Sequence, residues 1–202
     1  MRNGFCAALG LSMVVLSACQ GPGSPATAAA AAKSVTSLPQ PEVRPHSSAS
    51  LCTKDEVPVL SCAIKKTRKL ASLCAVRSDD LWKFRFLYGT PGQPPDAVSP
   101  SHGFDDGRSF NRSRLMLFDG AGGVVYSTVS DGQRYALYSI QGKGFARAGL
   151  QISPPAAETV TSDEECLHET LIESENDNLI DAVDRWESDP SFQDKNLPSV
   201  SR

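Results

Sequence analysis

The sequence predicts a mainly β fold, a small antiparallel sandwich or barrel with two disulfides, over residues 51–167. The clearest observation is a strict alternation along residues 82–88. It places four aromatic side chains on one face of a strand: Trp82, Phe84, Phe86 and Tyr88. Further short apolar runs follow at a spacing of about 8–12 residues, separated by turn pairs such as Asp131-Gly132. An even set of cysteines in the same region is the third observation.

The expected strands, in chain order, cover residues 60–64, 70–74, 82–88, 114–118, 123–129, 134–140 and 145–152. The first two flank a basic run at residues 65–69, which we expect at the tip of a hairpin. A contact of this run with anionic headgroups or with an acidic protein is the alternative. The Gly/Pro-rich run at residues 89–95 ends the aromatic strand.

Four cysteines belong to the predicted domain: Cys52, Cys62, Cys74 and Cys166. They allow three connectivities, and the sequence leaves the choice open. We favour Cys62–Cys74, because the runs around these residues have the pattern of neighbouring strands. Cys52–Cys166 would then join the start of the domain to its end. A zinc site is disfavoured, because there is no Cys-x-x-Cys pair and the only histidine nearby is His168. We therefore expect no metal and no cofactor.

The N-terminal residues 1–18 indicate a secretory signal peptide, with a positive start, a short apolar run and small residues before a cleavage site. The apolar run is too short to remain in a bilayer as a spanning helix. Its end, Leu16-Ser17-Ala18-Cys19, resembles the lipobox of bacterial lipoproteins. This resemblance implies that Cys19 is lipidated, with palmitate-type acyl chains, and becomes the new N-terminus.

Residues 19–50 are expected to form the lipidated N-terminus and a disordered tether, because they are rich in Gly, Pro, Ala and Ser. Several acyl chains together hold a protein firmly at a membrane. By analogy with enterobacterial lipoproteins, an Asp after the cysteine would signal retention at the inner membrane, and this chain has Gln20. The expected location is therefore the outer membrane, facing the periplasm.

The chain after Cys166 is acidic and has a loose helical pattern of apolar residues. We expect an acidic helix and a flexible tail over residues 168–202, lying on the sheet or exposed. The alternative is an amphipathic segment that folds on contact with a partner.

Several short runs of the predicted domain resemble a group of exported proteins and lipoproteins from proteobacteria. These runs are Val59-Leu60-Ser61-Cys62, Ser72-Leu73-Cys74-Ala75, Arg85-Phe86-Leu87-Tyr88-Gly89-Thr90-Pro91-Gly92 and Arg134-Tyr135-Ala136-Leu137-Tyr138. The order Phe86-Leu87-Tyr88-Gly89 departs from the Tyr-Arg-Phe-Gly of that group. The resemblance covers residues 51–152 and implies a β-rich exported domain with paired cysteines. It implies no catalytic residue.

Signatures of enzymes and of nucleic-acid binding are weak. The formal charge of −3 provides no basic footprint for nucleic acid. The histidines, His46, His102 and His168, lie in the tether, a Ser/Gly loop and the acidic segment, and no Gly-x-Ser-x-Gly elbow is present. The pair Asp105-Asp106 is better explained as turn residues before Gly107 than as two catalytic carboxylates. We assign no catalytic residue.

The favoured function is a non-catalytic envelope lipoprotein whose β domain binds an envelope protein or a glycan. A lysozyme-inhibitor-like role is one version of it, by analogy alone. The alternative is a weak hydrolase of envelope polymers that uses Asp105, Asp106 or His102. A purely structural lipoprotein is the third possibility. The candidate binding surface comprises Trp82, Phe84, Gly92, His102 and Asp105, although aromatic residues at such density more often form a core.

Overall fold

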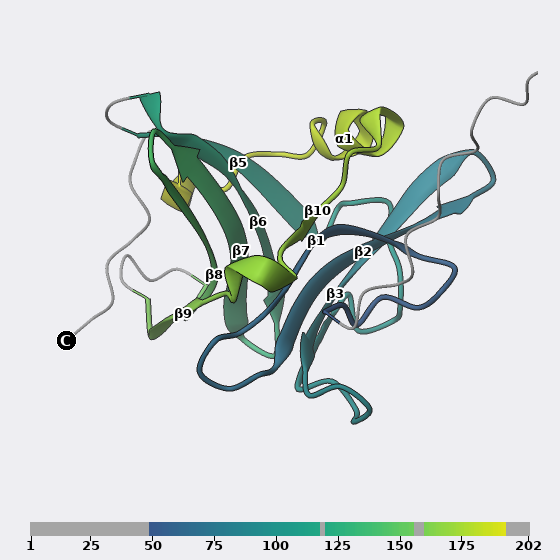
Figure 1. The fold of residues 1–202 in the computed structure, drawn as a ribbon. Coiled ribbons are helices and arrows are strands. Elements are labelled where there is room, and N and C mark those ends of the chain that lie inside the picture. Colours follow the sequence, from purple (N-terminus) through teal and green to yellow (C-terminus); the bar gives the residue numbers. More distant parts are fainter. Residues whose placement is uncertain (1–48, 118–119, 156–159, 193–202) are drawn as a thin grey trace, which may run out of the picture. The chain divides into compact units, whose positions relative to one another are not determined.

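The protein is a sandwich of two five-stranded antiparallel sheets in a computed structural model that describes residues 49–117, 120–155 and 160–192 (Figure 1). The predicted mainly β class is confirmed. The predicted signal peptide, Cys19 and nearly all of the predicted tether lie outside the described residues, as do residues 193–202.

The first sheet has the strand order β10-β1-β2-β3-β4. Its strands are β1 (Val57–Ala63), β2 (Leu70–Ser78), β3 (Leu81–Gly89), β4 (Ala97–Ser99) and β10 (Ile172–Glu173). The hairpin predicted around residues 65–69 joins β1 to β2. Asp79 and Asp80 join β2 to β3 with φ of 50° and 64°, the left-handed pair that a two-residue hairpin turn requires.

The second sheet follows the chain without a crossover, in the order β5-β6-β7-β8-β9. Its strands are β5 (Phe110–Met116), β6 (Gly122–Ser130), β7 (Gln133–Gly142), β8 (Phe145–Ser153) and β9 (Ser162–Glu165). The turn signal Asp131-Gly132 joins β6 to β7, with φ of 49° and 70°. The predicted strands thus match β1–β3 and β5–β8, whereas the short strands β4, β9 and β10 were not predicted.

The main core lies between the two sheets and follows the alternation seen in the sequence. Phe84, Phe86 and Tyr88 of β3 are buried in it, opposite Tyr135 and Leu137 of β7. Phe86 and Tyr135 place their ring centroids 5.5 Å apart. The aromatic face of β3 is therefore mostly core, and only Trp82, at the start of the strand, is half-buried.

Residues 49–56 cover the outer face of the first sheet. The Leu51 amide donates to Ser72 Oγ at 2.9 Å. Ser61 Oγ donates to the Ala49 carbonyl at 2.8 Å. The buried Glu56 carboxylate pairs with Arg85 at 2.7 Å. Cys52 lies in the same covering segment and is bonded to Cys74 of β2.

The disulfides are Cys52–Cys74 and Cys62–Cys166, with Cα–Cα distances of 5.5 and 5.8 Å. The favoured pairs Cys62–Cys74 and Cys52–Cys166 are therefore wrong. The physical reason is side-chain parity: Cys62 lies beside Ala71 in the register and shares its inner face. Cys74 lies an odd number of positions further along β2, so it points to the outer face. Adjacent strands thus present these two thiols to opposite sides of one sheet.

The segment after Cys166 packs against the sheets as far as Phe192, the last described residue. It forms the short turn η2 (His168–Thr170), β10 beside β1, the helix α1 (Asp177–Val183) and the turn η3 (Pro190–Phe192). Asn176 caps α1 by accepting a hydrogen bond from the Leu179 amide at 3.2 Å. Leu179 and Val183 are fully buried in the main core. The helix expected in this segment is therefore short and packed on the core, and the end of the expected tail, residues 193–202, lies outside the described residues.

The last described residues cover the outer face of the second sheet. Phe192 is fully buried in a second cluster with Val125, Tyr138 and Ile140. The buried ion pair Arg134–Asp189 (3.8 Å) holds the segment in place. The Glu187 carbonyl accepts a hydrogen bond from the Arg112 amide of β5 at 2.9 Å. Within the described residues, no helix is both long and apolar enough to cross a membrane.

The disulfide pairs can be tested directly, because trypsin cleaves after Lys54, Lys65 and Arg77 and so places each cysteine on its own peptide. We expect a non-reduced digest to contain two linked species, Cys52 with Cys74 and Cys62 with Cys166, that separate on reduction. Mass spectrometry of the two digests makes the measurement. A species linking Cys62 to Cys74 would contradict the structure.

Candidate functional site

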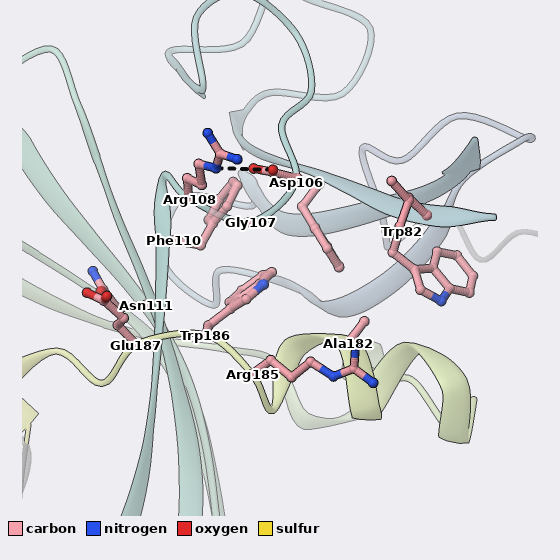
Figure 2. Close-up of a pocket in the computed structure, with 12 residues that line it drawn as sticks. Trp82, Asp106, Gly107, Arg108, Phe110, Asn111, Ala182, Arg185, Trp186 and Glu187 are labelled. Atoms are coloured by element: carbon pink, nitrogen blue, oxygen red, sulfur yellow. Dashed lines mark ion pairs between the residues drawn. The ribbon is translucent and has the colours of Figure 1, made fainter. Parts of the chain in front are cut away.

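A pocket of about 500 Å³ opens between the start of β3, the loop before β5 and the end of α1 (Figure 2). This volume lies within the usual range of small-ligand sites, roughly 300–1,000 Å³. We call it the tryptophan pocket, because both tryptophans of the chain line it. Its lining includes Trp82, Asp106, Gly107, Arg108, Arg185 and Trp186.

Trp186 forms the back of the tryptophan pocket, and three aromatic rings fix its position. Its ring stacks on Phe110 with centroids 5.2 Å apart. Phe84 meets it edge-on at 4.7 Å, and Tyr126 meets it edge-on at 6.0 Å. Trp186 is therefore a rigid part of the wall that joins the core to the pocket.

The loop above Trp186 owes its shape to Asp105 and Gly107. The Asp105 carboxylate accepts hydrogen bonds from the amides of Gly107 (2.7 Å) and Ser109 (3.0 Å). The Asp105 backbone also pairs with Phe84 of β3. Gly107 has φ +99°, and a Cβ there would overlap the indole nitrogen of Trp186. Only glycine allows the loop to approach the indole this closely.

Trp82 forms the opposite wall, on the hairpin that joins β2 to β3. Figure 2 shows its ring across the opening from Trp186 and Ala182. Its neighbour Leu81 also lines the pocket and is 63% exposed, a large value for a leucine. The pocket thus lies between two segments that are distant in the sequence, the hairpin and the end of α1.

Most charged side chains around the pocket pair with one another, but Arg185 and Glu187 have no ion pair among the described residues. Asp106 and Arg108 pair with one another at 3.1 Å on the loop. Asp184 pairs with Arg112 at 2.8 Å and Arg114 at 2.6 Å. Arg185 has no ion pair and no side-chain hydrogen bond within the described part of the chain. Its guanidinium is thus the cation at the pocket that no carboxylate of the described chain neutralises.

Burial is the main cause that raises the pKa of the Tyr126 phenol behind Trp186, and the nearby Arg112 partly opposes it. Tyr126 is therefore neutral at physiological pH and acts as a packing residue.

The predicted binding surface is partly brought together. Trp82 and Phe84 line the tryptophan pocket, and Asp105 shapes the loop above it. Gly92 and His102 are exposed and lie outside the pocket lining. Sequence reasoning missed Arg185 and Trp186 as site residues. The available signal was the second tryptophan, which the helical pattern placed among the apolar residues of the C-terminal segment.

One group of side chains in the described residues has the spacing of a metal site: Cys52, Glu56 and Cys74. The two sulfurs are bonded to one another, and the Glu56 carboxylate is held by Arg85 and by the Thr53 amide at 2.6 Å. A disulfide offers no thiolate ligand to a metal. The three residues are close together because they hold the segment 49–56 on the first sheet.

Comparisons with protein families, with curated proteins and with solved structures find no match to this chain.

The close approach of Gly107 to Trp186 predicts that Gly107→Ala destabilises the protein and displaces the indole. Gly103→Ala is the matched control, because Gly103 shares the loop and a positive φ of +111°, but a Cβ at that position would meet nothing within 4 Å. Both variants strain the backbone, and Gly107→Ala should lose a further 1–3 kcal/mol, roughly, from overpacking. Chemical unfolding and tryptophan fluorescence measure the two effects. Equal losses in the two variants would contradict this role of Gly107.

Proposed function

We propose that the chain is a membrane-anchored lipoprotein of the cell envelope, and that its sandwich is a non-catalytic binding domain. The tryptophan pocket carries the second part of this proposal. It combines a rigid aromatic wall with a few polar side chains at its edge, the usual composition of a ligand site.

The hydrolase alternative requires Asp105, Asp106 or His102 as a catalytic group. The positions and partners of these side chains favour a binding role instead. Both oxygens of Asp105 accept backbone hydrogen bonds that shape the loop. Asp106 pairs with Arg108. His102 is exposed and is not among the residues that line the pocket. General acid–base catalysis needs a group within hydrogen-bond reach of the reacting atoms, and these positions do not supply an evident pair.

The anchor rests on the sequence. The lipobox-like Leu16-Ser17-Ala18-Cys19 and the Gly/Pro/Ala/Ser-rich residues that follow support lipidation and a tether. The two disulfides support an oxidising compartment, in which such bonds persist. Together these features favour an exported protein, held at the outer membrane and facing the periplasm.

Binding without turnover is tested by co-sedimentation of residues 20–202 with purified envelope fractions, namely peptidoglycan sacculi and outer-membrane vesicles. We expect saturable retention on one fraction and no release of soluble fragments from it. Trp82→Ala should weaken retention, whereas Arg77→Gln, on the same hairpin but outside the pocket lining, should not. Fragment release that Asp105→Ala abolishes would instead support the hydrolase alternative.

Lipidation is tested by labelling producing cells with a palmitate analogue. The wild-type chain should incorporate the label and shift in mass by a lipid modification, and globomycin should block its maturation. Cys19→Ser should abolish the label, because the lipid attaches through that thiol. A labelled Cys19→Ser chain, or an unlabelled wild-type chain, would contradict the anchor.

A further inference from the structure

We propose that the ligand of the tryptophan pocket is a carbohydrate with an anionic group, its pyranose ring lying against the indoles and its anion paired with Arg185. This inference rests on the proposed binding function and gives that function a ligand class.

The walls suit a ligand with flat apolar faces. Trp186 is held by Phe84, Phe110 and Tyr126, so it requires little ordering when a ligand arrives. Trp82 stands opposite on a separate element (Figure 2). A pyranose presents C–H groups on its ring faces, and these pack on indole as other apolar groups do.

The polar groups of the pocket suit hydroxyls. The Trp82 indole N–H donates no hydrogen bond to any residue that the structure describes, whereas the Trp186 indole nitrogen lies against Gly107. Among the same residues, the side chains of Asn111 and Glu187 also have no hydrogen-bond partner. These groups include donors and acceptors, and a sugar carries hydroxyls that serve as both. A purely apolar ligand would leave all of them unused.

One cation of the pocket, Arg185, suits an anion. The Glu187 carboxylate, unpaired among the described residues, also lines the pocket, but Figure 2 shows it beside Asn111 and apart from the Arg185 guanidinium. Arg108 already has Asp106 as its partner, and Arg112 and Arg114 share Asp184. Arg185 is left with a guanidinium that can bind a carboxylate through two parallel hydrogen bonds. An acidic sugar therefore matches both the apolar walls and the unpaired cation.

Other ligand classes fit less well. An extended peptide would need a free strand edge, and the neighbouring edge of β5 is covered where the Arg112 amide donates to the Glu187 carbonyl. A nucleic acid would need a basic surface, whereas the chain is acidic overall, with a formal charge of −3.

The two tryptophans make the test specific, because both line the pocket and the chain has no other. Residues 20–202, labelled with ¹⁵N, are titrated with a tetrasaccharide of glucuronate and with the matching neutral tetrasaccharide of glucose. Glutarate serves as an anion without a sugar ring. We expect both indole N–H signals to shift saturably with the glucuronate oligosaccharide, and much more weakly with the other two probes.

Two variants distinguish the contribution of the anionic group to affinity from that of the sugar ring. Arg185→Gln should raise the Kd for the glucuronate oligosaccharide roughly tenfold through loss of a charged hydrogen bond, and should leave the weak binding of the neutral one unchanged. Trp82→Ala should weaken both oligosaccharides, with folding checked by the Trp186 signal. Arg77→Gln, outside the pocket lining, should change neither.

Equal affinity for the neutral and acidic oligosaccharides would overturn the role of the anion. Shifts with glutarate as large as those with the glucuronate oligosaccharide would overturn the role of the sugar ring. If neither oligosaccharide shifts the indole signals while retention on an envelope fraction persists, the carbohydrate inference fails and the binding function stands. If retention is also absent, both fail.

Discussion

The structure depends on the burial of a few apolar side chains from the end of the described chain. Leu179 and Val183 enter the core between the sheets, Trp186 packs on Phe110, and Phe192 covers the outer face of the second sheet. Each large side chain contributes about 1.5–3 kcal/mol when fully buried. The same burial creates the pocket, because Trp186 is both part of the packing and the back wall of the cavity.

The sequence predicted the long strands well because their signals are local. The alternation of residues 82–88 and the turn pair Asp131-Gly132 act within one hairpin, and β3, β6 and β7 formed where expected. The short strands were missed for the opposite reason. β9 is Ser162–Glu165, an acidic run with no apolar alternation, and it pairs only because β8 offers a free edge. Its formation is a property of the neighbour and not of its own residues.

The C-terminal segment shows how a helical pattern can mislead. Only Asp177–Val183 is helical, while Ile172 belongs to β10 and Phe192 to the turn η3. The apolar residues of the segment contact different parts of the sandwich: β1, the main core or the outer cluster. Their spacing therefore reflects the path of the segment over the sandwich and not one face of a long helix. The prediction of the cysteine pairs was wrong for a similar reason. It placed Cys62 and Cys74 on neighbouring strands correctly, but it did not account for the face of the sheet to which each thiol points.

Half of the candidate site was accessible to sequence reasoning, since Trp82 and Phe84 belong to the strongest strand pattern. The other half required the tertiary path that carries Trp186 back to β3, which no local rule supplies. Gly92 and His102 were plausible because loops on rigid sheets often carry recognition, but both residues lie outside the pocket lining.

A group of buried polar contacts around Asp189, here called the clamp, explains why the C-terminal segment follows one path over the second sheet. Asp189 accepts a hydrogen bond from Ser127 Oγ at 2.7 Å and pairs with Arg134, which also contacts Ser191. A buried ion pair adds little net stability over apolar packing, but a shifted alignment would leave its charges uncompensated, which is costly. The clamp therefore selects one alignment of residues 187–192 over the outer face of the second sheet. Because Trp186 directly precedes that aligned stretch, its indole is fixed at the pocket before any ligand is present.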